Sequence, residues 1–277
     1  MSVLKGQNEA ERDRTAYALA KQCLLQQAGA GVTPELLERY LHPKPRPSSI
    51  AEIYQRILES AQNANMKAGV VGGAIGGVDK LSSILCSFQP RAVLEKYSDW
   101  ESILNDVEQF LNPVGKIRRT SRSIWPHYCQ AILSGARFMS QFETPDDFYN
   151  WVSFFNNDSR ARPALPMLLA HEIEGFGFAL ASDFLKELGF INFAKPDVHL
   201  RDIFFGLNLC SASAKDYELS KAVVRLAINA GVSPYNADKI FWLIGSGFFY
   251  DDKQIGDKGK IGSLKALFIT EARAKLS

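Results

Sequence analysis

The sequence has few cysteines and no long apolar run. Its four cysteines, Cys23, Cys86, Cys129 and Cys210, form no C-x-x-C pair. They predict neither a structural zinc site nor a cysteine-ligated iron–sulfur cluster, and a reduced intracellular protein is the simpler interpretation. The N-terminal segment 1–22 is charged and no stretch of about 18 apolar residues is present, which gives no support to secretion or membrane spanning. We expect a cytoplasmic protein without a membrane partner.

The sequence also lacks an excess of either charge. It carries 32 Lys and Arg residues against 30 Asp and Glu residues, which gives a formal net charge of +2. This balance neither requires nor excludes a polyanionic partner, because clustering of charge on one face decides whether such a partner binds. The 277 residues are 46% hydrophobic, so the chain should fold as one compact unit or two closely packed lobes.

Apolar residues recur mainly at intervals of three and four positions, as in the stripe of Ile50, Ile53 and Ile57. This is the period of an α-helix, so the sequence predicts an all-α protein. Proline and glycine interrupt the pattern, and two interruptions, Thr144-Pro145 and Ser233-Pro234, pair an N-cap hydroxyl with a proline in the first helical turn. We divide the chain into four segments, 1–65, 66–165, 166–250 and 251–277.

A pair of glycines separates two expected helices in the third segment. The turn between them is Gly175-Phe176-Gly177. Glycine lets the backbone bend tightly and come close to a partner, while Phe176 can fill the gap between the helices. The N–H groups that open the second helix, at Phe178 and Ala179, would face outward, where the positive end of the helix dipole favours a DNA phosphate without reading sequence.

The second helix of this pair continues with a small residue, Ala181, at the place where the two helices must approach each other. Phe184, Leu185 and Leu188 extend its buried stripe, and Gly189 follows as the glycine that ends a helix. The next helix begins in the segment 195–200, which reads K-P-D-V-H-L.

Two motifs over residues 168–204, I-x-G-F-G-x-x-x-A and D-x-H-L, resemble the helix-hairpin-helix DNA glycosylase superfamily. The motif of that superfamily is roughly L-P-G-h-G-x-x-x-A followed by D-x-H-h. Asp197 lies 20 positions after Gly177 (197 − 177), a spacing similar to that of endonuclease III-like members. The resemblance implies an all-α, two-lobed helix-hairpin-helix DNA glycosylase-like fold, double-stranded DNA as the partner, a nucleoid-associated location and a monomeric chain.

The resemblance also implies that Asp197 is the catalytic residue. Cleavage of an N-glycosidic bond builds positive charge on the deoxyribose, which a fixed carboxylate can stabilise while it orients or deprotonates a water. Pro196 fixes the chain before Asp197, which could also cap the following helix. His199 is expected to support the DNA-binding site rather than act as a base, and Arg201 is a candidate phosphate ligand.

Three positions depart from the motif. Ala179 stands two residues after the second hairpin glycine, where bifunctional members carry a Schiff-base lysine. We therefore predict a monofunctional glycosylase that has water as its nucleophile and leaves an abasic site. Glu174 stands where proline is usual, and Arg201 lies one position earlier than the family's basic residue.

Base excision requires a pocket for the extruded base. The resemblance places it before the hairpin, where Gly73, Ile75, Trp125 and Tyr128 are our candidates. The glycine-rich segment 69–77 is not a P-loop, since no G-K-[ST] follows it.

A short basic stretch lies just before Trp125. Its members Lys116, Arg118, Arg119 and Arg122 could follow DNA phosphates, a purely electrostatic contribution.

Two other functions stay open. A chain that keeps the hairpin without turnover would be a non-catalytic DNA-binding protein, and Lys195, near Asp197, could make it an abasic-site lyase. The predicted hydrolysis requires no metal and no cofactor, although backbone carbonyls of the hairpin could hold a monovalent cation. The identity of the base does not follow, because selectivity depends on pocket shape.

Charged residues outside these motifs are expected at the protein surface. Lys186, Lys195, Asp238 and Lys239 belong to this group. The segment 251–260 is polar and contains glycine, so we expect a loose loop there.

Overall fold

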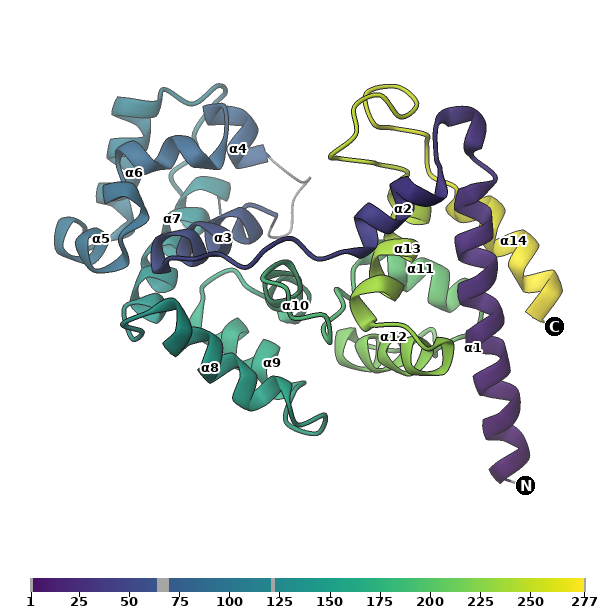
Figure 1. Ribbon diagram of the computed structural model, residues 1–277. Helices are drawn as coiled ribbons and strands as arrows, with labels where there is room; N and C mark the ends of the chain where they lie inside the picture. The colour runs from purple at the N-terminus through teal and green to yellow at the C-terminus, as the bar shows by residue number, and fades with distance from the viewer. Residues whose placement is uncertain (1, 64–69, 121–122, 277) are drawn as a thin grey trace. The chain divides into compact units, whose positions relative to one another are not determined.

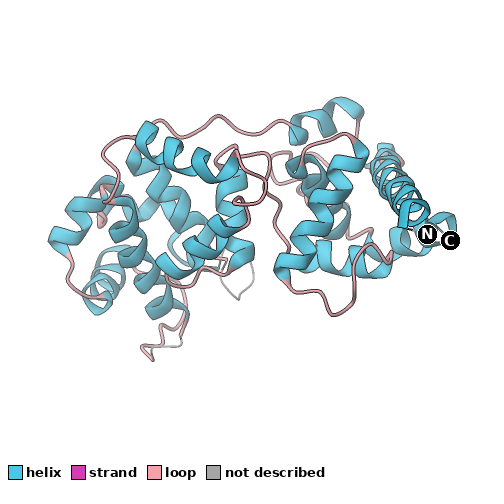
Figure 2. Cartoon of the chain, turned by 90° about the horizontal axis from the view of Figure 1, so that it is seen from below, coloured by secondary structure: helices cyan, strands magenta, loops and turns pink. Residues whose placement is uncertain are grey.

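The computed structural model describes residues 2–63, 70–120 and 123–276. Within these ranges Figure 2 shows helices joined by loops, and the β-type pairing consists of isolated bridges from Lys260 to Phe248, Gly256 and Asp257. The predicted all-α class is therefore confirmed. No helix in the described ranges is both long enough and apolar enough to cross a membrane.

The α-helices are, in chain order, α1 (Ser2–Leu25), α2 (Pro34–Leu41), α3 (Ile50–Ala61), α4 (Val70–Ile75), α5 (Pro90–Lys96), α6 (Trp100–Asp106), α7 (Ile124–Met139), α8 (Pro145–Asn156), α9 (Ala164–Glu172), α10 (Phe178–Glu187), α11 (Val198–Gly206), α12 (Asp216–Ala230), α13 (Pro234–Ser246) and α14 (Lys265–Leu276). Shorter helical turns are η1 (Ala28–Ala30), η2 (Val78–Ser83), η3 (Cys86–Phe88) and η4 (Val107–Leu111).

The chain folds into two compact units. The terminal unit contains residues 1–44 and 189–277, and the central unit contains residues 45–188. The chain passes from the central unit to the terminal unit just after α10, because α10 packs on α3 and α9 of the central unit. The four segments that we drew from the sequence do not coincide with these units, since the segment 166–250 runs from one unit into the other.

In the terminal unit, α1 packs along α12, α13 and α14, and Figure 1 shows purple α1 beside yellow α14. A fully buried carboxylate, Asp13, joins α1 to α12. It accepts hydrogen bonds from Arg225 Nε at 2.9 Å and from Asn229 Nδ2 at 2.7 Å. A buried carboxylate is costly without such partners, so this cluster fixes the position of α1 on α12.

In the central unit, α3 and α7 pack against each other and bury two phenols. The Tyr54 hydroxyl donates to Ile132 O at 2.7 Å, and the Tyr128 hydroxyl donates to Leu58 O at 3.1 Å. Each helix thus satisfies a buried polar group of the other. The helices α5, α6 and α9 also contact α7, and α8 contacts α9.

The helix ends predicted from sequence are confirmed. Thr144 Oγ1 accepts the N–H of Asp147 at 3.1 Å, and Ser233 Oγ accepts the N–H of Asn236 at 3.1 Å. Both are N-caps followed by proline. Gly189 has a φ of +83° just past the end of α10, the left-handed conformation that ends a helix.

Three charged residues expected at the surface are buried, which corrects the prediction for Lys186, Asp238 and Lys239. Lys186 Nζ lies 3.3 Å from a carboxylate oxygen of Asp183 on the same helix. Asp238 accepts the backbone N–H of Lys195, and Lys239 Nζ donates to a tyrosine hydroxyl at 2.9 Å. Each buried charge therefore has a polar partner, which compensates for part of its lost hydration.

The segment 251–260 is anchored, which corrects the prediction of a loose loop. The Ile255 side chain is buried, and Asp252 pairs with Arg39 of α2 at 2.6 Å. The prediction was wrong because it rested on the polar composition of the segment and did not consider Ile255, its single apolar side chain. The following helix α14 is docked through the buried Phe268.

Candidate functional site

The predicted hairpin turn, residues 173–177, lies between α9 and α10 in the central unit. Gly175 has a φ of +80°, a conformation that favours glycine. The N–H of Phe176 donates to Ile173 O at 3.0 Å. The Phe176 side chain is buried, and its ring centroid lies 6.2 Å from that of Phe184 in an edge-to-face arrangement. Phe176 therefore closes the turn against α10, as expected.

Three backbone N–H groups at the start of α10 have no hydrogen-bond acceptor in the described part of the chain. They belong to Gly177, Ala179 and Leu180, and Gly177 supplies no side chain to cap the helix. The helix dipole adds partial positive charge at this end. Grouped, unbonded amides of this kind can bind one phosphate.

The two hairpin glycines differ in what the fold requires of them. At Gly175 an added Cβ would lie 2.9 Å from His127 Nε2 and the residue would keep a positive φ. At Gly177 the φ is −106° and an added Cβ would meet no atom within 4 Å. The fold alone therefore requires glycine at 175 but not at 177, where the exposed backbone is open to a partner.

Glu174 replaces the proline of the family motif, and its backbone N–H has a partner. It donates to Ser134 Oγ of α7 at 2.9 Å, and this hydroxyl in turn donates to Gln130 O at 2.9 Å. A proline would have no N–H to satisfy. The contact made by Ser134 could not be predicted, because nothing in the sequence pairs α7 with the hairpin turn.

Asp197 caps α11 in the terminal unit. Its Oδ1 accepts the N–H groups of His199 at 2.9 Å and of Leu200 at 3.1 Å, which confirms the predicted capping. Its Oδ2 receives no hydrogen bond from the described residues. The Asp197 side chain is half-buried and the adjacent Val198 is 60% exposed. The carboxylate is thus held by one oxygen and keeps the other for a substrate or water.

The aspartate loop, residues 191–197, is held by α13. The N–H of Tyr235 donates to Ile191 O at 3.0 Å, and the Asp238 carboxylate accepts the N–H of Lys195. Lys195 O then accepts the N–H of Asp197 at 2.8 Å. The backbone that leads to the carboxylate is therefore fixed at three points.

His199 and Arg201 serve the packing of α11. The His199 ring lies 6.5 Å from that of Trp242 on α13, and its buried Nδ1 has no partner among the described residues. Arg201 donates to Ala214 O at 2.7 Å and pairs with Asp216. Arg201 would have to exchange these partners in order to bind a phosphate.

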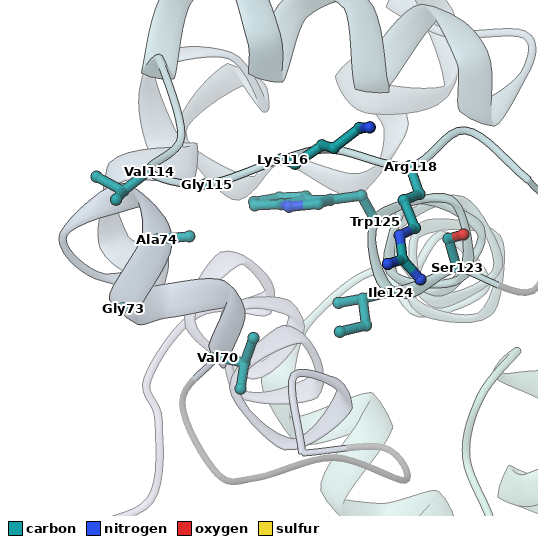
Figure 3. Close-up of a pocket in the computed structure, with 10 residues that line it drawn as sticks. All are labelled: Val70, Gly73, Ala74, Val114, Gly115, Lys116, Arg118, Ser123, Ile124 and Trp125. Carbon is teal, nitrogen blue, oxygen red and sulfur yellow. The ribbon is translucent and has the colours of Figure 1, made fainter.

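A pocket of about 710 Å³ lies in the central unit between α4, the loop after η4 and the start of α7 (Figure 3). The Trp125 indole lies between α4 and the loop that carries Lys116. Lys116 and Arg118 are exposed, and neither forms an ion pair within the described ranges. The pocket thus combines an aromatic surface with two available cations. Its lining residues are Val70, Gly73, Ala74, Val114, Gly115, Lys116, Arg118, Ser123, Ile124 and Trp125.

Two of the predicted pocket residues, Gly73 and Trp125, therefore meet in one pocket, together with Arg118 of the basic stretch. Ile75 and Tyr128 are buried and do not line it. Burial raises the pKa of Tyr128 well above its ordinary value, so this phenol stays neutral in the core of the unit.

The rest of the basic stretch does not line this pocket. Arg119 donates to Asn105 at 2.9 Å and pairs with Glu108, and Arg122 lies outside the described residues. Among the residues that are described, no group of three or more His, Cys, Asp and Glu side chains could hold a metal ion.

Comparison with known proteins identifies the fold as that of a helical DNA glycosylase. The matching structure is an 8-oxoguanine glycosylase/lyase from Methanocaldococcus jannaschii in complex with a 15mer DNA containing 8-oxoguanine. It has a TM-score of 0.50 and 13% sequence identity, and the match covers 80% of this chain and 95% of that chain. No protein-family model and no curated protein sequence match this chain.

Proposed function

We propose that this protein is a monofunctional DNA glycosylase, which hydrolyses the N-glycosidic bond of a damaged or modified base and leaves an abasic site. The observation that carries this proposal is the Asp197 carboxylate, fixed at the N-terminus of α11 with Oδ2 unbonded among the described residues. The fold shared with a DNA glycosylase/lyase supports it.

In the proposed reaction the bond between the base and the sugar carbon C1′ breaks, and the base leaves with the bonding electrons. A carboxylate is suited to stabilise the oxocarbenium-like sugar and to take a proton from the attacking water. The water oxygen forms the new bond to C1′. Asp197 can perform this role without losing its capping bonds, because these bonds occupy only Oδ1.

Double-stranded DNA is the proposed partner, held through a phosphate by the hairpin amides of Gly177, Ala179 and Leu180. These amides have no acceptor among the described residues, and glycine at 177 leaves them uncovered. Binding to the phosphate backbone is independent of sequence. The cations Lys116 and Arg118 beside Trp125 fit a nucleic acid, since aromatic stacking and phosphate neutralisation act together in such sites.

The absence of lyase chemistry is part of the proposal. Ala179 lies in the first turn of α10, at the position where the resemblance leads one to expect a Schiff-base lysine. Lys195 is the alternative amine, because it is two residues from Asp197. A lyase using Lys195 would form a covalent imine with the sugar, which borohydride reduces to a stable adduct.

The decisive experiment is a panel of duplex oligonucleotides that contain uracil, alkylated, oxidised, mismatched and hypermodified bases. We expect heat-labile abasic sites in at least one duplex with the wild-type protein, and none above background with Asp197→Asn. Asparagine can still cap α11, so the variant should stay folded and bind DNA. Binding of DNA without any abasic product across the panel would favour the non-catalytic DNA-binding protein.

Borohydride trapping distinguishes the two catalytic alternatives. We expect no covalent adduct between the protein and a duplex that it converts to abasic sites. An adduct that forms with the wild-type chain and disappears in Lys195→Gln would overturn the monofunctional proposal and establish the lyase.

A further inference from the structure

Helix α13 carries a buried carboxylate, Asp238, that the proposed reaction does not use. Its side chain is 0% exposed, and it accepts the backbone N–H of Lys195. A carboxylate in the protein interior loses most of its hydration, so a chain that needed only a well-packed helix would place an apolar residue there. The residue faces the aspartate loop rather than solvent.

Lys195, whose N–H Asp238 accepts, lies two positions before Asp197 in the chain. The backbone of Lys195 forms two hydrogen bonds. Its N–H donates to the Asp238 carboxylate, and its carbonyl accepts the N–H of Asp197 at 2.8 Å. Pro196, which lies between them, is buried and has a fixed φ. Few backbone rotations therefore separate the Asp238 carboxylate from Asp197.

The same helix also fixes the chain after Asp197. An added Cβ at Gly245 of α13 would lie 2.4 Å from His199 Cβ, so the first turn of α11 is in direct contact with α13. The N–H of His199 is one of the two donors to Asp197 Oδ1. Helix α13 thus holds the residues on both sides of Asp197, through a charged hydrogen bond on one side and through close packing on the other.

We propose that Asp238 is a positioning residue for Asp197, one that fixes the aspartate loop through the N–H of Lys195 so that the Asp197 carboxylate keeps one orientation. The proposal rests on the proposed function, in which Asp197 carries the chemistry. Asp238 itself touches no substrate. Its contribution is the accuracy with which the carboxylate is placed, to which reaction rates are sensitive.

The test compares Asp238→Ala with Asp238→Asn. Asparagine keeps an acceptor oxygen for the Lys195 N–H, and alanine does not. In single-turnover assays on the duplex that yields abasic product, we expect Asp238→Ala to lower the excision rate by about tenfold to a hundredfold. We expect Asp238→Asn to recover the rate to within about threefold of the wild type, while both variants bind the duplex with a Kd within about twofold of it.

Asp13→Ala is the matched control. Asp13 is also 0% exposed, lies in the same unit and is held by Arg225 and Asn229, far along the chain from Asp197. Its loss should lower the melting temperature without slowing excision. The proposal is wrong if Asp238→Ala and Asp13→Ala, compared at equal folded fraction, give the same excision rate.

Amide hydrogen exchange tests the positioning without requiring activity. In Asp238→Ala we expect faster exchange of the N–H groups of Asp197, His199 and Leu200, and unchanged exchange in the last two turns of α12, which carry the Asp13 partners Arg225 and Asn229. Asp13→Ala should give the converse pattern. Unchanged exchange around Asp197 in Asp238→Ala would overturn the positioning role even if no duplex is ever cleaved. Accelerated exchange without any excision by the wild type would instead refute only the glycosylase function.

Discussion

The N-termini of α10 and α11 differ in whether the N-cap side chain accepts hydrogen bonds from the backbone N–H groups of the first turn. At α10 the N-cap is Gly177, which has no side chain that could accept a bond from the first turn. At α11 the N-cap is Asp197, whose carboxylate accepts two of the N–H groups of that turn. Both ends carry partial positive charge from the helix dipole, but at α10 the N–H groups of Gly177, Ala179 and Leu180 have no acceptor in the described part of the chain.

Phosphate binding and the fixing of a carboxylate place opposite demands on the N–H groups of a helix N-terminus. A phosphate can bind only where amides are unoccupied, whereas a catalytic carboxylate has to be held still. The hairpin turn leaves the amides of α10 open, and the aspartate loop is tied to α13 by Tyr235 and Asp238.

The largest effect is expected when the carboxylate of Asp197 is replaced. Asp197→Ser keeps an N-cap oxygen, and Asp197→Ala removes it, but both remove the charge. We expect both to lower the single-turnover excision rate by about 10²- to 10⁴-fold, because the group proposed to activate water is lost. Thermal unfolding should separate them, since Asp197→Ala costs about 0.5–2 kcal/mol of stability and Asp197→Ser much less. A Ser variant that retains excision would remove Asp197 from the chemistry.

Crowding the contact between α13 and α11 should give the next largest effect. In Gly245→Ala the new Cβ would lie 2.4 Å from His199 Cβ, close to the backbone, so one helix must shift. We expect a loss of about 1–3 kcal/mol in the free energy of unfolding, measured by urea denaturation. Gly177→Ala is the control, because its Cβ would meet no atom within 4 Å. Equal stabilities for the two variants would show that α13 does not fix the start of α11.

The helices, the hairpin turn and the Asp197 cap could be predicted from sequence because each depends on a local pattern of residues. The three- and four-residue spacing gave the helices, and Gly175, Phe176 and Asp197 have the conformations and contacts that their residue types favour. The N-caps at Thr144 and Ser233 followed from hydroxyl–proline pairs in the same way.

The sequence did not reveal contacts between distant segments. Asp238 looked like an exposed helix residue, yet it lies three positions after the buried Tyr235 and three before the buried Phe241. This helical spacing places it on the apolar face of α13, and the pattern could have predicted its burial. Nothing in the sequence could have shown that its partner is Lys195, because that pairing depends on how α13 packs on the aspartate loop.

Making the start of α10 resemble that of α11 is a direct test of the comparison. In Gly177→Asp the new carboxylate can cap α10, since the N-cap already has the extended conformation that capping requires. We expect stability to rise by a few tenths of a kcal/mol relative to the wild type, and by about 0.5–2 kcal/mol relative to Gly177→Ala. The affinity for duplex DNA, measured by fluorescence anisotropy, should fall by about tenfold or more because the amides are occupied and the added charge repels phosphate. Unchanged affinity would remove the hairpin from DNA binding.

A smaller effect is expected at the pocket of the central unit. Lys116→Gln and Arg118→Gln each remove a cation that has no ion-pair partner within the described ranges. If each contacts one phosphate, the affinity falls severalfold and the slope of log K against log[salt] decreases in magnitude by about 0.9 per variant. Arg160→Gln is the control, because Arg160 is already paired with Asp158 at 2.9 Å. Identical slopes for all three variants would mean that the pocket does not meet the DNA backbone.

The smallest effect concerns the monovalent cation expected at the hairpin. Carbonyl oxygens of the hairpin turn, residues 173–177, would have to hold the ion, and the one at Ile173 already accepts the N–H of Phe176 at 3.0 Å. A bound cation would add positive charge beside the amides of Gly177 and Ala179 and so strengthen phosphate binding. Replacing potassium chloride by tetramethylammonium chloride at constant ionic strength should then weaken duplex binding by about twofold to threefold, which is small because general screening is unchanged. The effect should vanish in Gly177→Asp, whose carboxylate already occupies the phosphate site. Equal affinities of the wild type in the two salts would show that the amides bind phosphate without help from a cation.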